Sequence, residues 1–378
     1  MIIGFDAKRA AQNRTGLGNY SRFVIRILKD RMQECHLYIP NPQKTAALGT
    51  LKDVKGITLH YPTTLFGRIF RSLWRVWGVS SDLRRDGIQL YHGLSNELPL
   101  NIRKAGCKSI VTIHDLIFLS HPQYYKPIDR LIYNYKFRRA CINADHIIAV
   151  SEYTKQQIIK YYGTKADKIS VVYQGCDPSF SAPVDGATLQ KIRLRYMLPE
   201  RYVLYVGSIE ERKNLMLVAR ALQQIDDDTV RVVAVGRPTP YLDKIKSFLH
   251  EKQLEERFLF LHDVPFADLP ALYHAASVFV YPSRIEGFGI PMLEAISAGV
   301  PAIGCTGSCL EEAGGPGSLY VDPDDAQGMA DAIMSIWNDA DRAAKMVEEG
   351  RRYAQRFTDE KLSEDLISII HYQLSIIN

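Results

Sequence analysis

The sequence predicts an α/β protein of two domains, each built on a doubly wound parallel sheet covered by helices. Three observations lead to this fold class. Short apolar runs rich in Val, Ile and Tyr alternate with helical patterns along the whole chain. Its 378 residues exceed the roughly 250–300 at which a single hydrophobic core stops growing. A stretch with no strand pattern, residues 179–200, divides the alternating patterns into two groups.

The expected strands and helices follow one another in order. In the first group, apolar runs occupy residues 2–5, 36–40, 57–61, 88–93, 109–115, 146–151 and 169–174, and helical patterns occupy 18–32, 70–85, 131–143 and 152–162. In the second group, the runs are 202–208, 230–236, 258–263, 277–283, 300–305 and 318–322, with helices at 215–225, 241–253, 268–276, 289–299 and 328–339. Strands that alternate with helices pair in parallel.

We expect residues 1–185 to form the first domain and residues 186–357 the second. The final stretch, 341–378, is helical in pattern and no strand follows it, so its last part, about 358–378, is expected to pack back on the first domain. Ligands of such sheets bind beyond the carboxyl ends of the strands. The expected site is therefore a cleft across which the two domains face each other.

The charge of the chain is divided unequally between its halves. Residues 1–189 contain 27 Lys and Arg against 14 Asp and Glu, whereas residues 190–378 contain 20 against 28. A basic half can face an anionic membrane surface or a phosphorylated ligand. Nucleic acid is not an expected partner, because no nucleic-acid-binding motif accompanies the charge.

The rest of the composition indicates a reduced, cytoplasmic protein. No apolar run approaches the ~20 residues that span a bilayer, and the N-terminal MIIGFDAKRAA lacks the features of a secretory signal. The six cysteines show no spacing typical of zinc sites. The acidic clusters at 226–228 and 322–325 have no His or Cys set beside them, so we expect no metal.

The segment SRIEGFGIPMLEA, residues 283–295, places Glu286 before a Gly-Phe-Gly turn and Glu294 in the helix that follows. Ionised carboxylates only accept hydrogen bonds, which suits the hydroxyl groups of a sugar or a ribose. Alternatively, Glu286 acts as a helix cap and Glu294 as a charge that interacts with the helix dipole. The segment alone leaves both interpretations open.

Three further motifs suit a phosphorylated sugar ligand, each with a structural alternative. In TGLGNY, Gly16 and Gly18 would let the backbone approach a phosphate, although a plain loop before a helix explains them equally well. Arg212 and Lys213 follow a strand and could neutralise a diphosphate, or form a solvated basic pair. His114, at a strand end, could contact a sugar hydroxyl or transfer a proton, or be structural.

The segment 66–85 combines aromatic and basic side chains. They are Phe66, Phe70, Trp74 and Trp77 with Arg68, Arg71 and Arg75. A helix of this kind can lie on an anionic membrane. The alternative is a packed helix with a solvated basic face.

Taken in order, the motifs resemble those of a known family. EGFGIPMLEAISAGVPAIG, with two glutamates in E-x7-E spacing, is similar to the signature of the retaining family-four glycosyltransferases, which have the two-domain GT-B fold. TGLGNY, HGLSNELP, HDL, AVSEYTK, VVYQGCD, VGSIEERKN, VGRP, HDVPFADLPALY and LYVDPDD accompany it over nearly the whole chain. HDLIFLSHPQYY and TGLGNY look most like the mannosyltransferase-like members. Two departures, Gln174 for Asn and Glu311 for Pro, concern acceptor or loop details.

The resemblance implies a role for each motif residue. In the catalytic set, Glu286 would bind hydroxyls of the donor hexose, Arg212 and Lys213 the diphosphate, and His114 the transferred sugar. Glu294 would take the ribose diol. The other donor-binding positions would be Gly287, Phe288 and Gly289 around the sugar, Gly16 and Gly18 over the diphosphate, and Arg237 and Val264 at the base.

The implied activity is a retaining, metal-independent transfer of a hexose from a nucleotide sugar, with GDP-mannose favoured as donor. The acceptor would be a glycan or lipid-linked molecule of cell-surface polysaccharide assembly, held by the basic first domain. No cofactor is implied, since the nucleotide sugar is a substrate. The expected location is the cytoplasm, with peripheral contact at the inner face of an anionic membrane.

Other functions remain open on the sequence alone. A UDP-sugar-dependent transferase of the same fold and a non-catalytic sugar-nucleotide-binding protein are the main alternatives. A dinucleotide-dependent oxidoreductase is disfavoured, because Ser21 stands where the fingerprint requires a third glycine.

Overall fold

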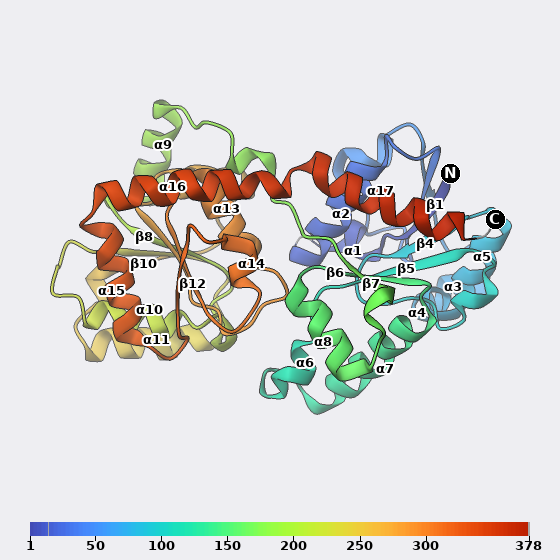
Figure 1. The fold of residues 1–378 in the computed structure, drawn as a ribbon, viewed down its shortest axis with the longest axis horizontal. Helices are drawn as coiled ribbons and strands as arrows, with labels where there is room; N and C mark the ends of the chain where they lie inside the picture. The colour runs from blue at the N-terminus through green and yellow to red at the C-terminus, as the bar shows by residue number, and fades with distance from the viewer. Residues whose placement is uncertain (14, 377–378) are drawn as a thin grey trace. The chain divides into compact units, whose positions relative to one another are not determined.

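The protein consists of two compact units in a computed structural model that describes residues 1–13 and 15–376 (Figure 1). Met1–Gln174 and the segment that starts at Thr358 form the first unit, and Gly175–Phe357 form the second. The chain therefore enters the second unit earlier than the predicted boundary at 185. The reason is Phe180, whose fully buried ring packs on Tyr273, with centroids 5.2 Å apart. The expected linker, 179–200, thus packs on the second unit.

The first unit is built on a seven-stranded parallel sheet with the order β3-β2-β1-β4-β5-β6-β7. Phe5 of β1 lies opposite Leu37 on one side and His92 on the other. The order runs outward in both directions from the β1/β4 pair, which confirms the doubly wound parallel sheet predicted from the sequence. The strands are β1 (Ile2–Asp6), β2 (Glu34–Tyr38), β3 (Ile57–His60), β4 (Leu90–Gly93), β5 (Lys108–Ile113), β6 (His146–Ala149) and β7 (Ile169–Val171).

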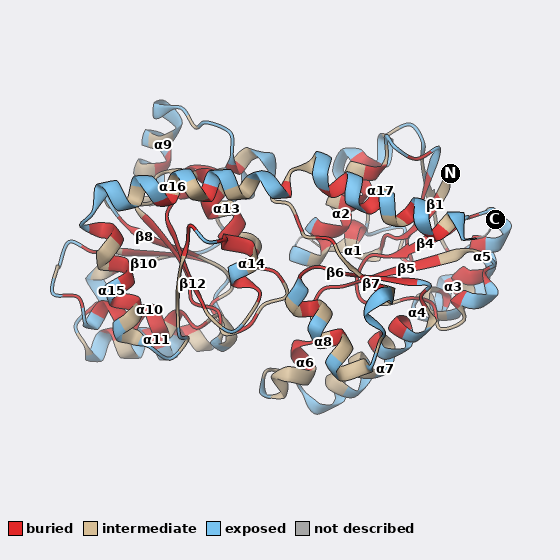
Figure 2. Ribbon diagram, viewed as in Figure 1, coloured by how far each residue is buried: buried red, intermediate tan, exposed pale blue. Residues whose placement is uncertain are grey.

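The helices of the first unit cover this sheet, and Figure 2 shows the strands buried with exposed residues on the outer helices. They are α1 (Lys8–Gln12), α2 (Gly16–Leu28), α3 (Leu65–Ile69), α4 (Arg71–Leu73), α5 (Val79–Arg85), α6 (Ile117–Ser120), α7 (Pro127–Asn143), α8 (Glu152–Tyr162) and α17 (Asp359–Ser375). The last of these packs on α2, where Arg26 pairs with Asp359 at 2.5 Å.

The second unit contains a six-stranded parallel sheet with the order β10-β9-β8-β11-β12-β13. Its strands are β8 (Val203–Val206), β9 (Val232–Val235), β10 (Phe258–Leu261), β11 (Val278–Tyr281), β12 (Ala302–Cys305) and β13 (Leu319–Val321). Its helices are α9 (Gly186–Tyr196), α10 (Leu215–Gln223), α11 (Tyr241–Glu251), α12 (Leu269–His274), α13 (Ile290–Ala298), α14 (Leu310–Gly314), α15 (Ala326–Trp337) and α16 (Ala340–Ala354). The order reverses between β8 and β11, where ligands of such sheets bind.

The predicted helix 70–85 is not continuous. A π-helical turn, Trp74–Gly78, separates α4 from α5. Trp74 is buried and donates a hydrogen bond from Nε1 to Asp82 (2.7 Å). The Arg75 side chain is only 11% exposed, and its guanidinium pairs with Asp6 and Glu97 at 2.5 Å each. The interpretation of Trp74 and Arg75 as membrane-facing residues is therefore wrong, because both side chains bond to acidic residues within the unit.

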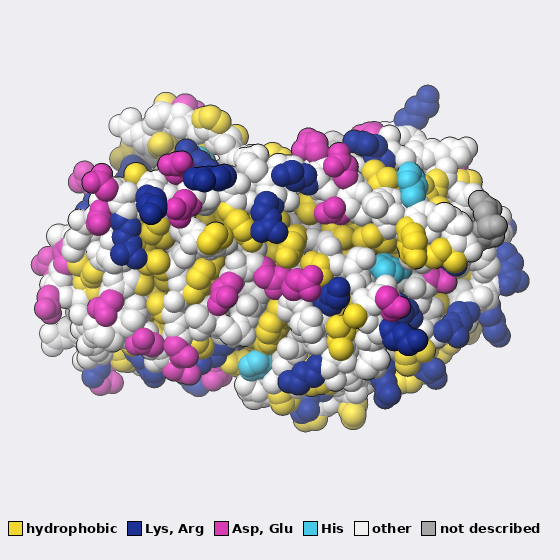
Figure 3. All heavy atoms as spheres, viewed as in Figure 1, with side chains coloured by type: hydrophobic (Ala, Val, Ile, Leu, Met, Phe, Trp, Pro, Cys, Tyr) yellow, Lys and Arg dark blue, Asp and Glu magenta, His cyan; other side chains and the backbone are white. Residues whose placement is uncertain are grey.

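The surface carries the charge asymmetry found in the sequence. On the face shown in Figure 3, Lys and Arg side chains are dense around α3, α4 and α5, whereas Asp and Glu side chains are frequent over the second unit. No helix of the described chain, 1–13 and 15–376, is both long and apolar enough to cross a bilayer.

Candidate functional site

Four side chains converge on one carboxylate oxygen at the reversal point of the second sheet. Glu286 follows β11, and its Oε1 lies 2.6 Å from Lys213 Nζ and 3.0 Å from an Arg212 guanidinium nitrogen. The Ser283 hydroxyl also donates to Oε1 (2.5 Å), as does the Tyr281 hydroxyl (3.2 Å). The structure thus brings together the three predicted residues Arg212, Lys213 and Glu286.

This arrangement keeps the carboxylate ionised. Burial alone would raise the pKa of Glu286, but Arg212 and Lys213 together lower it to about 2. Burial lowers the pKa of Lys213, and Glu286 opposes that effect. All hydrogen bonds and ion pairs of the Glu286 side chain with the described residues involve Oε1. The other oxygen, Oε2, is therefore available to accept a hydrogen bond.

The turn after Glu286 requires its second glycine. Gly289 is the N-cap of α13 and has φ 110°, a conformation that disfavours other residues. A Cβ atom at this position would also lie 2.7 Å from Cδ2 of Leu310. Phe288 is buried, with its ring centroid 5.6 Å from that of Phe357. The predicted sugar-holding turn, Gly287 to Gly289, is thus positioned against the core of the unit.

Glu294 lies in the second turn of α13 and has a different environment. It is half-buried, and the Tyr273 hydroxyl donates to its Oε2 at 2.8 Å. Burial raises the pKa of Glu294 to about 7, although the hydrogen bond from Tyr273 opposes the rise. The two glutamates of the E-x7-E signature therefore differ strongly in proton affinity.

The two residues predicted at the base follow neighbouring strands of the same sheet. Arg237 comes shortly after β9 and is exposed, and Val264 comes shortly after β10 and is half-buried. Strands β9 and β10 are paired in parallel, so both residues lie at the carboxyl edge of the second sheet.

In the first unit, Gly16 and Gly18 occupy the first turn of α2. A Cβ atom on Gly18 would overlap the carbonyl oxygen of Asn13, whereas one on Gly16 would meet no atom of the described residues within 4 Å. Gly18 is therefore required by the packing of the chain itself. Gly16 has no such constraint.

His114 follows β5 and is buried in the first unit. Its Nε2 lies 2.9 Å from the carbonyl oxygen of Leu94, which must accept, so Nε2 carries the proton. Its Nδ1 can then accept from the amide of Gln174 at 3.4 Å. Burial lowers the pKa of His114 to about 4. The imidazole is thus neutral at pH 7, which favours orienting a ligand over donating a proton as an acid.

The sequence did not identify Ser283, Tyr281 and Tyr273 as partners of the two glutamates. A signal exists for two of them, since VYPS directly precedes the turn that carries Glu286. Tyr273 lies in another helix, α12, and nothing in the local pattern relates it to Glu294.

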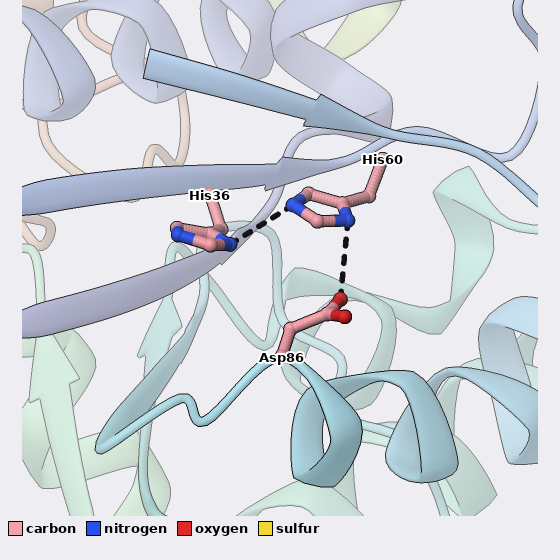
Figure 4. A group of neighbouring side chains, drawn as sticks. All are labelled: His36, His60 and Asp86. Atoms are coloured by element: carbon pink, nitrogen blue, oxygen red, sulfur yellow. Dashed lines mark hydrogen bonds and ion pairs between the residues drawn. The ribbon is translucent and has the colours of Figure 1, made fainter. Parts of the chain in front are cut away.

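The described residues contain one group with metal-ligand chemistry, His36, His60 and Asp86 (Figure 4). His60 lies between the other two, with Nε2 2.9 Å from Nδ1 of His36 and Nδ1 3.1 Å from Oδ2 of Asp86. The ring nitrogens of the two histidines face each other at a hydrogen-bond distance. Zinc needs about 2.0–2.1 Å to each nitrogen, so this relay would have to open to hold an ion. The group belongs to the first unit, apart from the cluster around Glu286.

Two family models match the chain in the predicted order. The model described as Glycosyltransferase Family 4 matches residues 14–180, and that described as Glycosyl transferases group 1 matches residues 192–353. Together they cover most of both units.

Curated proteins and a solved structure agree with these matches. O-antigen chain mannosyltransferase B of Escherichia coli is 31% identical over 284 residues, which are 74% of this chain and 73% of that protein. O-antigen chain mannosyltransferase RfbU of Salmonella typhimurium is 30% identical over 226 residues, so the match spans only 60% of its length. Anabaena HepE, solved with UDP and glucose, has a TM-score of 0.78 over 98% of this chain and 100% of its own, at 18% identity. By these matches, the chain belongs to the family-four glycosyltransferases, is mannosyltransferase-like, and has the GT-B fold.

Proposed function

We propose that this glycosyltransferase transfers mannose from GDP-mannose, with retention of configuration, to a glycan or lipid-linked acceptor in cell-surface polysaccharide assembly. The observation that carries the proposal is the convergence of Arg212 and Lys213 on Glu286 at the reversal point of the second sheet. The choice of mannose is supported by the two relatives that are named O-antigen chain mannosyltransferases.

Arg212, Lys213 and Glu286 together can bind both groups that the donor's scissile bond joins, the diphosphate and the hexose. A guanidinium and an ammonium group offer the donors and the charge that a diphosphate needs. The free oxygen of Glu286, Oε2, can accept a hydrogen bond from a hexose hydroxyl. Because these cations already provide positive charge, we propose that a metal ion is not required.

In the proposed step, the bond from the anomeric carbon to the diphosphate oxygen breaks and a bond to the acceptor oxygen forms on the same face. The departing diphosphate oxygen takes the acceptor's hydroxyl proton. Arg212 and Lys213 stabilise the negative charge that develops on the diphosphate. Glu286 is ionised, with a pKa of about 2, and in this step it only accepts a hydrogen bond from the hexose through Oε2, so no covalent intermediate on it is proposed.

The other predicted residues complete the donor site in this proposal. Glu294 accepts hydrogen bonds from the ribose hydroxyls, and Arg237 and Val264 contact the base. Gly287, Phe288 and Gly289 hold the hexose. Gly16 and Gly18 approach the diphosphate through their backbone, and His114 orients the transferred sugar.

The first test is thermal stabilisation by a panel of GDP, UDP, ADP, their sugar conjugates and NAD, with and without EDTA. A ligand at about 100 times its Kd adds about 2.7 kcal/mol of stability, which should raise Tm by several degrees in a unit of this size. We expect GDP and GDP-mannose to stabilise most, with no effect of EDTA. Stabilisation by UDP compounds alone would contradict the donor assignment, and stabilisation by NAD alone would contradict the entire proposal.

A pair of variants shows whether the stabilising ligand occupies the proposed site. Glu286→Gln and Lys213→Met should each reduce the Tm shift caused by GDP-mannose. Glu311→Gln is the matched control, because Glu311 is an exposed glutamate of the same unit. An equal Tm shift in all three variants would place the ligand elsewhere. Release of free mannose from GDP-mannose, or its transfer to an acceptor, would separate an enzyme from a binding protein.

We also propose that the first unit contacts the membrane through α3 and the turn that follows it. The exposed side chains there are Leu65, Phe66, Ile69, Phe70, Leu73 and Trp77. Basic residues of the same segment, Arg68 and Arg71, would favour an anionic surface. Vesicles of phosphatidylglycerol should bind the wild type more tightly than a Phe66→Ser, Trp77→Ser variant. Equal binding would count against membrane contact.

A further inference from the structure

A pocket of the first unit is lined by none of the residues assigned to the donor. It has a volume of about 390 Å³ and opens where β2 and β3 end. It is lined by Pro40, Pro42, Tyr61, Pro62, Arg68 and Arg71. The carboxyl ends of parallel strands are where ligands of such sheets bind, so its position is that of a binding site.

The lining of the pocket suits an anion attached to an apolar group. Three proline rings and Tyr61 give it rigid apolar walls, and no carboxylate is among its lining residues. Arg68 and Arg71 contribute two guanidinium groups, and no carboxylate of the described residues lies within 4.0 Å of either. Guanidinium groups without an acidic partner bind phosphate oxygens well, often through two parallel hydrogen bonds.

The walls of the pocket are held in place by the two strand ends. The backbone N–H of Ile39 donates to the carbonyl oxygen of His60 at 2.8 Å. The Tyr38 hydroxyl donates to Asp86 (2.9 Å), which also contacts His60. The residues that follow these strands, Pro40 and Tyr61, are therefore fixed relative to each other before a ligand arrives. Preorganisation of this kind lowers the cost of binding.

The helix that carries Arg68 is positioned by a glycine. Thr64 caps α3 by accepting a hydrogen bond from the N–H of Gly67 at 3.1 Å. A Cβ atom on Gly67 would lie 3.0 Å from Oγ1 of Thr64 and 3.1 Å from Cβ of Pro62. The absence of a side chain at Gly67 lets α3 approach the pocket wall and brings Arg68 to its rim.

An exposed apolar surface adjoins these arginines on the same segment. Leu65, Phe66, Ile69, Phe70 and Leu73 are between 38% and 76% exposed. The ring centroids of Phe66 and Phe70 lie 4.9 Å apart, so these two rings contact each other on this apolar surface. A free sugar phosphate would need only the pocket, whereas a phosphate on a long hydrocarbon chain would use both the pocket and this face.

We infer that the pocket binds the phosphate or diphosphate group of a lipid-linked acceptor, and that the lipid chain lies on the exposed face of α3. This inference rests on the proposed function, since it names the acceptor of the same transferase. Arg68 and Arg71 contact the phosphate oxygens, while the proline and tyrosine walls receive the first carbon atoms of the chain.

The test measures binding of three probes to the whole protein by titration calorimetry. They are farnesyl diphosphate, which has both parts, inorganic pyrophosphate, which has only the anion, and farnesol, which has only the chain. We expect farnesyl diphosphate to bind at least tenfold more tightly than either of the others. Equal affinity for farnesyl diphosphate and pyrophosphate would overturn the lipid part of the inference.

Two variants assign the binding to the pocket. Arg68→Gln together with Arg71→Gln should weaken farnesyl diphosphate binding at least tenfold. Arg31→Gln together with Lys52→Gln removes the same charge from exposed positions of the same unit and should leave it unchanged. Equal losses in both pairs would mean general attraction of anions and would overturn the inference. The inference would also be overturned if Arg68→Gln with Arg71→Gln weakened binding to phosphatidylglycerol vesicles and left farnesyl diphosphate binding unchanged. That result would indicate that the arginines bind a membrane surface in place of the acceptor.

The outcome can be distinguished from that of the proposed function. The Tm shift caused by GDP-mannose is measured on the same Arg68, Arg71 variant, whose donor residues all lie elsewhere. If GDP-mannose raises the Tm of the wild type but farnesyl diphosphate does not bind to it, the acceptor pocket is overturned and the proposed function stands. A wild type that binds farnesyl diphosphate through the two arginines but no nucleotide sugar would overturn the proposed donor and leave the anion site standing.

Discussion

Replacing Glu294 by Gln is expected to reduce the dependence of stability on pH. Burial raises the pKa of this carboxyl group from its ordinary value of 4.5 to about 7 in the folded protein. The folded state therefore holds the proton more tightly than the unfolded state does. Gln has nearly the same shape, can still accept the hydrogen bond from the Tyr273 hydroxyl, and does not ionise.

The sign and size of the effect follow from linkage between folding and proton binding. Below pH 4.5 the carboxyl group is protonated in both states, and its stabilising contribution is fully present. As pH rises from 4.5 through 7, ionisation favours the unfolded chain, so the free energy of unfolding of the wild type falls. The difference between the two pKa values corresponds to about 3 kcal/mol. Because Glu294 keeps some contact with solvent, we expect about 2 kcal/mol of this between pH 5 and pH 8.

The assay is urea denaturation of the wild type and Glu294→Gln at pH 5 and pH 8, followed by tryptophan fluorescence. Trp337 is the one tryptophan of the second unit, so variants in which Trp74 and Trp77 are replaced by Phe report that unit alone. The free energy of unfolding of Glu294→Gln minus that of the wild type should be about 2 kcal/mol larger at pH 8. Glu311→Gln is the matched control, because it removes an exposed carboxylate from the same unit. A difference that is the same at both pH values would refute the reasoning.

Three other outcomes are expected. Lys213→Met should lower the ratio of GDP affinity to GMP affinity roughly tenfold or more, because a hydrogen bond to a charged group contributes about 1.5–3 kcal/mol. An unchanged ratio, measured by calorimetry, would mean that the lysine does not contact the diphosphate. Gly18→Ala should destabilise the protein by roughly 1–3 kcal/mol through overpacking against Asn13, whereas Gly16→Ala should be nearly neutral. If urea denaturation shows the same loss of unfolding free energy for both variants, the packing argument is contradicted. Burial lowers the pKa of His60, so the free energy of unfolding should fall as pH drops below 6.5, and less so in His60→Phe; parallel pH curves for the two proteins would contradict this.

The sequence predicted the two sheets well because buried parallel strands have a strong pattern. Runs such as 146–151 and 230–236 are apolar on both faces and are bounded by polar turns, so their positions could be read directly. The boundary between the two units was harder to predict from the sequence. Phe180 looks like a linker residue in the sequence, and only its packing against Tyr273 assigns it to the second unit.

The sequence predicted those site residues that lie in short motifs next to a strand. Glu286 and the Arg212–Lys213 pair were found from their places after strands, and the structure brings them into contact. Whether a basic aromatic segment faces solvent could not be read in the same way. Trp74 and Trp77 are equivalent in the sequence pattern, yet only Trp77 is exposed, because Asp82 and a π-helical turn direct Trp74 inward.

The return of the chain to the first unit has a consequence for the order of synthesis. The segment that begins at Thr358 contributes the buried residues Leu362, Leu366 and Ile370 to a unit whose other part ends at Gln174. A ribosome completes the entire second unit before it releases this last helix. Until then, the surface of α2 that α17 covers is exposed on the nascent chain, and a premature stop between residues 174 and 358 leaves the first unit without its closing helix.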